Sequence, residues 1–187
     1  MSELDDIKKR LDRVESRTKI QELCTAYAIA CDDRDMKTIA DIFTEDCVFR
    51  SKDGMMTANG RQSILEMYRG RFRALGATYH WTHDLTVTFD AANPDSATGL
   101  TLGHAECWRN NEPQIAAMRY EDEYRREADG KWRFARRTLS FLYYVNMNEY
   151  TTALGQPDRM RAYGDRRAAD YPESLPTWTT WEQPVNA

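Results

Sequence analysis

Several features that mark common protein classes are missing from this 187-residue sequence. No run approaches the ~18 consecutive apolar residues that a membrane-spanning helix needs, and the acidic N-terminus lacks the apolar stretch of a secretory signal. The four cysteines form no CxxC pair, which disfavours a disulfide framework. A formal net charge of -4 argues against a broadly basic, nucleic-acid-binding surface. We therefore expect a cytoplasmic protein with neither membrane nor nucleic-acid partners.

The common motifs of metal, nucleotide and hydrolase sites are also missing. There is no GxSxG, no Walker A loop and no GxGxxG, so the usual hydrolase, nucleotide and dinucleotide sites are not expected. Neither HExxH nor HxH is present. The segment from His80 to Asp84 superficially resembles a metal-ligand cluster, but a regular strand would place His80 and His83 on opposite faces. We expect no metal and no cofactor.

The hydrophobic pattern that is present changes period along the chain. Apolar residues at helical spacing predict helices over 3–15, from Thr18 to about 31, over 36–43 and over 62–74, with a turn at 44–46 and a strand at 47–50. After Gly76 the period becomes two, which predicts strands over 80–89, 97–108, 115–126 and 131–145. This order indicates an α+β fold, with helices packed on one side of a curved antiparallel sheet.

The last forty residues have a different composition. They contain most of the prolines together with Trp178 and Trp181. A short helix over 157–168 is expected, and the rest should be irregular. We therefore divide the chain into a domain over 1–145 and an extension over 146–187 that packs on the domain or on a neighbouring subunit.

Asp32 is the first candidate for chemistry. It ends the apolar face of the second predicted helix, where a carboxylate is costly unless a partner neutralises it or hydrogen-bonds to it. Histidine is the natural partner, because a carboxylate fixes the imidazole tautomer and makes it a competent proton acceptor. The alternative is that Asp32 and Asp33 simply form a solvated helix end. The residues alone leave both interpretations open.

Two further residue types could serve a site. Each of the three histidines, taken alone, is more often structural than catalytic; strand alternation puts His104 on a mostly apolar face with Leu102 and Trp108. In the last predicted strand the same alternation puts Arg136 on the face of the aromatic residues Trp132 and Phe134, and Arg137 on the other face. Arg136 would then need an anionic partner, either a substrate or a structural carboxylate.

Together, the order of elements and these residues resemble the SnoaL-like group of the nuclear transport factor 2-like superfamily. The resemblance covers about residues 5–145. It is nearest in motif to the hexachlorocyclohexane dehydrochlorinases, in the helix around Ile20-Gln21-Glu22-Leu23 and in Asp32, His80 and Arg136 at matching positions. The family folds as a cone in which helices wrap a strongly curved sheet around a deep pocket, so the resemblance implies an α+β barrel of this kind.

Two other members of the superfamily resemble the chain in part. The spacing from Tyr27 to Asp32 is similar to that in bile-acid 7α-dehydratases, and His104 falls where scytalone dehydratases have a second histidine. Phe49 falls where the latter have a water-orienting tyrosine, and a phenyl ring cannot donate a hydrogen bond. The resemblance therefore implies a shared acid–base pair without a shared substrate.

The resemblance implies a cofactor-independent, dehydratase-type lyase acting on a hydrophobic cyclic small molecule. His80 would be the base, Asp32 would orient it, and Tyr27, His104 and Arg136 would bind the leaving group or stabilise negative charge. The alternatives are an isomerase or polyketide-type cyclase using the same base, and a non-catalytic binding domain. A homo-oligomer is expected, with a trimer favoured and a dimer next.

Overall fold

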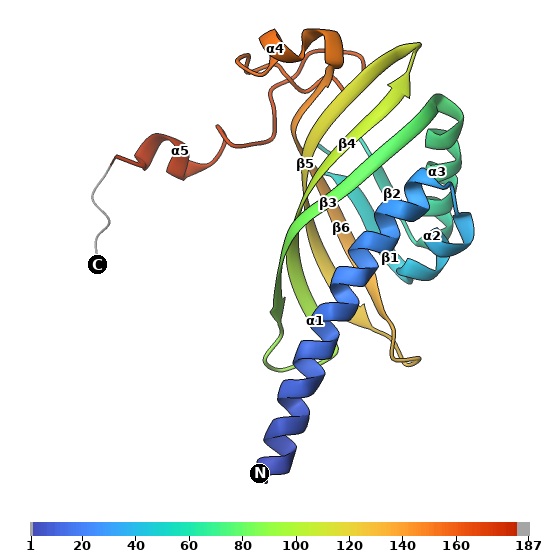
Figure 1. The fold of residues 1–187 in the computed structure, drawn as a ribbon, viewed down its shortest axis with the longest axis vertical. Helices are drawn as coiled ribbons and strands as arrows, with labels where there is room; N and C mark the ends of the chain where they lie inside the picture. Colours follow the sequence, from blue (N-terminus) through green and yellow to red (C-terminus); the bar gives the residue numbers. More distant parts are fainter. Residues whose placement is uncertain (1, 183–187) are drawn as a thin grey trace.

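The computed structural model describes residues 2–182, in which most of the helical content precedes the long strands (Figure 1). The main elements in chain order are α1 (Glu3–Asp32), α2 (Met36–Ile42), β1 (Phe43–Ser51), β2 (Thr57–Asn59), α3 (Arg61–Ala74), β3 (Leu75–Phe89), β4 (Ser96–Arg109), β5 (Glu112–Arg126) and β6 (Trp132–Asn146). A short 3-10 turn (Met147–Glu149), α4 (Tyr150–Ala153) and α5 (Pro176–Thr180) follow. The predicted α+β class is confirmed.

The strands form one open sheet in the order β2-β1-β6-β5-β4-β3. The predicted meander is confirmed, because β3 to β6 pair antiparallel in sequence. The sequence pattern did not reveal that β1 runs parallel to β6, which makes the sheet mixed. The turn predicted at residues 44–46 is wrong, since these residues lie inside β1.

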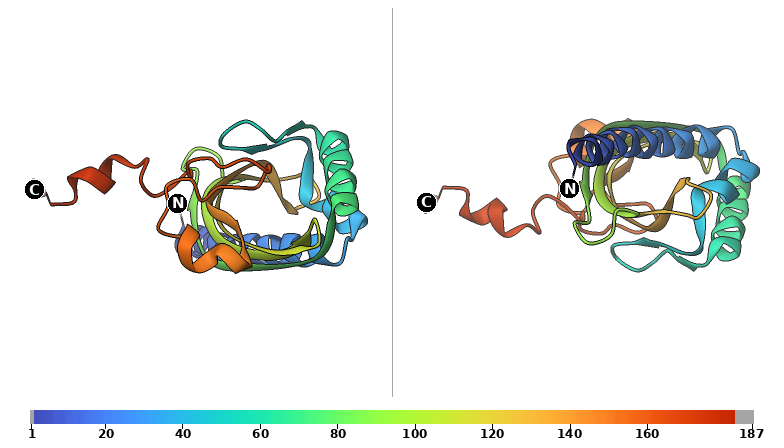
Figure 2. Two further views of the ribbon diagram at one scale, coloured as in Figure 1. Left: turned by 90° about the horizontal axis from the view of Figure 1, so that it is seen from above. Right: turned by 90° about the horizontal axis from the view of Figure 1, so that it is seen from below.

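The sheet curls strongly about its concave face. Viewed along the long axis, it wraps around the interior, with α1 along one side and α3 closing another (Figure 2). The hydrophobic core fills the space between them. Ile20 and Tyr27 of α1, Phe43 of β1 and Phe134 of β6 are all at most 4% exposed. Helices α1 and α3 therefore pack their apolar side chains against the concave face of the sheet.

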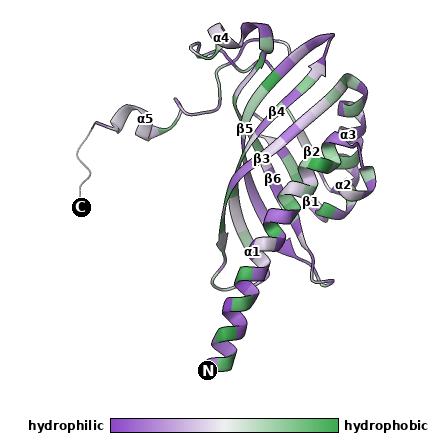
Figure 3. Ribbon diagram, in the orientation of Figure 1, coloured by the Kyte–Doolittle hydropathy of each residue, from purple (hydrophilic) through white to green (hydrophobic). Residues whose placement is uncertain are grey.

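Helix α1 is continuous, so the prediction of two helices meeting near Thr18 is wrong. Ser2 begins the helix through a capping box with Asp5, whereas the Thr18 hydroxyl donates to the Val14 carbonyl inside the helix and caps nothing. The first turns, before Asp12 pairs with Arg126 of β5, extend beyond the sheet with their apolar stripe exposed, Leu11 being 55% exposed (Figures 1 and 3). None of the helices within residues 2–182 is long and apolar enough to cross a membrane.

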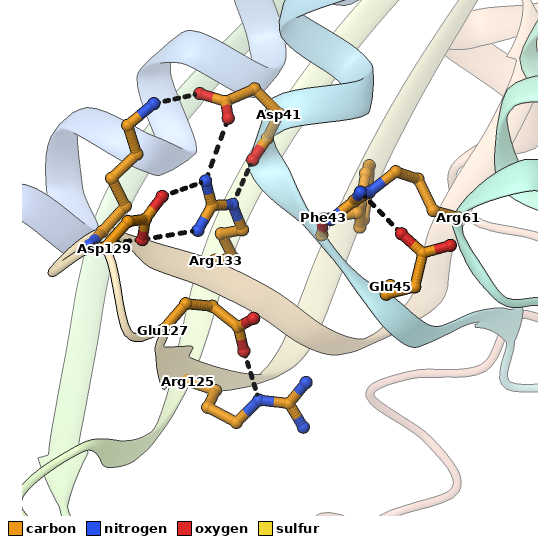
Figure 4. A network of polar contacts seen from close by, with 9 residues as sticks. Asp41, Phe43, Glu45, Arg61, Arg125, Glu127, Asp129 and Arg133 are labelled. Atoms are coloured by element: carbon orange, nitrogen blue, oxygen red, sulfur yellow. Dashed lines mark hydrogen bonds and ion pairs between the residues drawn. The ribbon is translucent and has the colours of Figure 1, made fainter.

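Ion pairs on the surface tie α2 and β1 to their neighbours. Arg133 of β6 donates to the Asp41 backbone carbonyl at 2.6 Å and pairs with the side chains of Asp41 and Asp129 (Figure 4). Arg61 of α3 donates to the Phe43 carbonyl. These donors satisfy one carbonyl near the end of α2 and one at the start of β1.

The helix predicted over 157–168 is wrong. This segment is irregular and bridges to β6, with Met160 opposite Tyr144. Met160 is 2% exposed and belongs to the main core, so the segment packs on the domain. By contrast, α5 stands away from the sheet, and Trp178 is 51% exposed (Figure 1). The division into 1–145 and 146–187 stays a prediction, and its last residues, 183–187, lie outside the described part.

Candidate functional site

Asp32 and His80 form the contact that the family resemblance implies. Asp32 is the last residue of α1, and His80 lies on β3, which α1 covers. His80 Nδ1 is 2.6 Å from Asp32 Oδ1, and the His80 backbone N–H donates to Asp32 Oδ2 at 2.7 Å. The Thr78 hydroxyl, two residues earlier on the same face of β3, donates to Oδ1 at 2.9 Å. Three donors therefore fix the carboxylate against the strand.

These contacts determine the protonation state of Asp32. Burial raises the pKa of the Asp32 carboxyl. The hydrogen bonds from His80 and Thr78 lower it by more than burial raises it, so the pKa lies below its ordinary value of 3.8. An ionised Asp32 is an acceptor only, which requires the Nδ1 atom of His80 to carry a proton and to donate it. In the neutral ring this tautomer leaves the Nε2 lone pair free.

The Nε2 atom of His80 is the ring nitrogen that Asp32 does not contact. It makes no hydrogen bond with any residue in the described part of the chain, and the His80 side chain is 19% exposed. The Asp32 side chain is 23% exposed. Both side chains are thus partly open to solvent. The geometry suits proton abstraction, with Asp32 balancing the positive charge that forms on the ring.

Tyr27 and Phe49, both predicted as auxiliary residues, lie in the core of the concave side. The Tyr27 hydroxyl accepts a hydrogen bond from the Tyr68 hydroxyl at 2.7 Å, and the residue is 4% exposed. Burial, the largest cause, and the neighbouring Tyr68 raise the pKa of Tyr27 well above its ordinary value. Phe49 is fully buried and packs edge-on against Tyr68. Both residues thus shape the interior behind the pair.

The face predicted for Arg136 is wrong. The β5–β6 register shifts between the pairs Glu123–Arg136 and Tyr124–Phe134, so Ala135 is an extra residue in a β-bulge. Beyond the bulge the alternation reverses. Arg136 lies on the convex face near Glu123, with the two side chains 3.3 Å apart, and it cannot serve the concave site.

Arg137 occupies the interior position instead. It is fully buried, donates two hydrogen bonds of 2.8 Å to Asp122, and stacks on the Phe134 ring at 3.9 Å. Burial acts to lower the pKa of Arg137, but the Asp122 charge raises it well above its ordinary value. Strand alternation missed this arginine because a bulge leaves no simple mark in a single sequence.

His104 lies on the opposite side of the sheet from the Asp32–His80 pair. Its register partner is Trp81, whereas His80 faces Ala105, so the role that the resemblance assigns to His104 in the same pocket is contradicted. His104 instead contacts His83 at 2.8 Å and Tyr143 at 3.1 Å. The predicted separation of His80 from His83 is confirmed. Within residues 2–182, no group of three or more His, Cys, Asp or Glu side chains could hold a metal.

A pocket of about 310 Å³ opens between α1 and β3. On β3 it begins at Thr82, two residues beyond His80, and on α1 it includes Gln21 and Thr25. The register of β3 with β4 shifts between Thr82 and Leu85, beside this pocket. His83 and Thr101 also line it, whereas Asp32 and His80 do not, so the pocket lies beside the pair.

Known proteins resemble this chain in sequence and structure. A sequence model for a SnoaL-like domain matches residues 12–138. The gamma-hexachlorocyclohexane dehydrochlorinase of Sphingobium indicum is 27% identical over 136 residues, covering 72% of this chain and 86% of that enzyme. The crystal structure of LinA superposes with a TM-score of 0.69 at 25% identity, covering 74% of this chain and 94% of LinA. A scytalone dehydratase-like protein from Novosphingobium aromaticivorans shares the fold, with a TM-score of 0.66 at 20% identity and coverage of 72% and 89%.

Proposed function

Because the chain belongs to the SnoaL-like family, we propose that it is a cofactor-independent lyase in which His80 removes a proton from a hydrophobic cyclic small molecule. The observation that carries this proposal is the 2.6 Å contact between His80 Nδ1 and Asp32, with Nε2 left free. The dehydrochlorinase relative supports an elimination, since its name describes the removal of hydrogen chloride.

The proposed reaction begins with transfer of a proton from a substrate carbon to Nε2 of His80. The electron pair of the broken C–H bond forms a double bond, and the leaving group departs from the neighbouring carbon with its own electron pair. Asp32 stabilises the imidazolium, which later returns its proton to solvent. A positioned base of this kind contributes about 10²–10⁴-fold to the rate.

The interior arginine has a limited part in this proposal. Arg137 takes the place expected of Arg136, but Asp122 already balances its charge through two hydrogen bonds. We assign Arg137 to holding the aromatic interior in place, where its guanidinium lies 4.1 Å from the Tyr27 ring centre. Binding of the leaving group therefore needs another residue.

Solvent-deuterium exchange into a cyclic ketone such as 4-oxocyclohexanecarboxamide tests the base directly, because exchange requires abstraction of the proton next to the carbonyl. We expect exchange with the wild-type protein and a loss of about 10²-fold or more in His80→Ala. Asp32→Asn should lose a comparable amount, while His104→Ala, on the convex face, should exchange as the wild type does. Equal exchange by His80→Ala and the wild type would rule out this role for His80.

An isomerase or cyclase would use the same base and would give the same exchange. Product analysis separates the reactions, because elimination releases a leaving group whereas isomerisation conserves every substrate atom. A non-catalytic binding domain would retain ligand binding without any exchange that depends on His80.

A further inference from the structure

Arg71 of α3 is a cation on the inner side of the fold without a carboxylate partner. It lies three residues after Tyr68 and seven after Ile64, which places it on the same helix face as these two buried residues. In the part of the chain that the structure describes, its only side-chain hydrogen bond runs from Nη1 to the Met56 sulfur at 3.4 Å, and it forms no ion pair. A thioether is a weak acceptor and carries no charge.

Two other arginines, Arg61 and Arg137, differ from Arg71 in having a carboxylate partner. Arg61, at the start of the same helix, pairs with Glu45 at 2.7 Å, and Arg137 pairs with Asp122 (Figure 4 shows the first). Asp53, three residues before Met56, has other partners, since Ser51 donates to it and Arg167 lies 3.7 Å from it. Keeping a guanidinium partly buried without an anion costs free energy, so the missing partner is informative.

Arg71 shares its helix face with Tyr68, which contacts α1 behind the Asp32–His80 pair. The Tyr68 hydroxyl, one turn before Arg71, donates to Tyr27 of α1 at 2.7 Å, which joins the two helices behind the pair. The pKa values of Cys31 and Cys107 respond to the Arg71 charge, although burial is the larger cause in both. Cys31 precedes Asp32, and Cys107 is the register partner of Thr78, so the two thiols flank the pair.

From this arrangement we infer that Arg71 binds an anionic group, such as a carboxylate, carried by the molecule on which His80 acts. The inference rests on the proposed function, because it concerns the ligand of the same site. The guanidinium would form two hydrogen bonds to one carboxylate, which is the geometry that arginine favours. The substrate would then have an apolar ring between the proton removed by His80 and a negative charge held by α3.

The chain supplies a matched control for this inference. Arg73 lies on the same helix, two residues beyond Arg71, and its side chain is exposed. Arg71→Gln and Arg73→Gln remove the same charge from neighbouring positions, so a general electrostatic effect would be similar in both. Arg71→Lys keeps the charge but gives up the two-pronged geometry.

The test compares 4-oxocyclohexanecarboxylate with its carboxamide as ligands of the full chain, in an NMR binding titration. We expect the wild type to bind the carboxylate at least about tenfold more tightly than the carboxamide, since hydrogen bonds to charged groups are the stronger ones. Arg71→Gln should lose this preference, Arg71→Lys should keep part of it, and Arg73→Gln should keep all of it. Equal binding of the two ligands by the wild type, or a preference that persists in Arg71→Gln, would overturn the inference.

Failure of this inference and failure of the proposed function give different results. The binding titration needs no turnover, so it reports on Arg71 even where His80→Ala leaves deuterium exchange unchanged. Exchange into the neutral carboxamide reports on His80 even where Arg71 contributes nothing.

Discussion

The carboxylate of Asp32 determines what His80 can do. Its two oxygens accept hydrogen bonds from the His80 ring, the His80 backbone N–H and the Thr78 hydroxyl. The ring therefore cannot turn without losing a hydrogen bond to a charged acceptor. The pKa of Asp32 is lowered in the folded chain. Its ionised form therefore stabilises the fold above about pH 4, and this contribution is lost as the pH falls toward the lowered value.

Thr78→Val removes one of the donors that hold this pKa down. We expect the pKa of Asp32 to rise in the variant, because the hydrogen bond from Thr78 favours the ionised carboxyl. The measurement is an NMR titration of the side-chain carboxyl carbon of Asp32. Thr88→Val, at an exposed position on the same strand, is the control and should leave the titration unchanged. A pKa that does not move in Thr78→Val would contradict the assigned hydrogen bond.

The buried pair of Arg137 and Asp122 makes a separate prediction. Asp122→Asn leaves a guanidinium buried without its counter-charge, so we expect the free energy of unfolding to fall by about 3–5 kcal/mol. Glu123→Gln breaks the exposed pair with Arg136 on the other face and should change stability by no more than about 1 kcal/mol. Urea denaturation of both variants measures the difference. Similar losses of stability in the two variants would contradict the burial of Arg137 in the interior.

At the scale of elements, the sequence predicted the type of most helices and strands but not where their faces point. Helical and strand periods identified α2, α3 and the four strands of the meander, because burial on one face imposes those periods. The bulge at Ala135 reversed the alternation in β6 and exchanged the roles of Arg136 and Arg137. Asp32 and His80 could be paired in advance because each lies in a regular segment whose position the family resemblance supplied.

Two glycines in these elements should respond to alanine with opposite signs. A methyl group on Gly99 of β4 would lie 2.6 Å from the Thr86 carbonyl oxygen and 2.9 Å from the Tyr124 ring, so we expect Gly99→Ala to cost about 1–3 kcal/mol. Gly70, inside α3, has open space around it, and Gly70→Ala should stabilise the fold by up to about 1 kcal/mol. Thermal unfolding measures both, and a tolerated Gly99→Ala would mean that β3 and β4 lie further apart than described.

At the scale of the whole molecule, the C-terminal segment could not be placed from sequence. Its prolines and its lack of a clear period indicated irregular structure, yet nothing in the pattern showed that Met160 enters the core. The buried Arg159 holds the segment by donating to the Leu142 carbonyl and pairing with Glu173 at 2.6 Å. Such contacts between distant residues leave no periodic trace. The expected homo-oligomer, with a trimer favoured, also stays a prediction, which sedimentation of the full chain would test.

The contacts of this segment predict that it unfolds together with the domain. Met160 is 2% exposed, so Met160→Ala should lower the free energy of unfolding by about 2–5 kcal/mol through the cavity it leaves. Leu154, also in the segment, is 39% exposed, and Leu154→Ala should stay within about 0.5 kcal/mol. If the segment instead opened independently, Met160→Ala would leave the unfolding midpoint of the domain unchanged and would only speed amide exchange beyond Asn146. A single cooperative transition with a lowered midpoint would therefore show that residues 147–171 unfold together with the domain. The segment then supports the site, because it packs against the same core as Tyr27 and Tyr68.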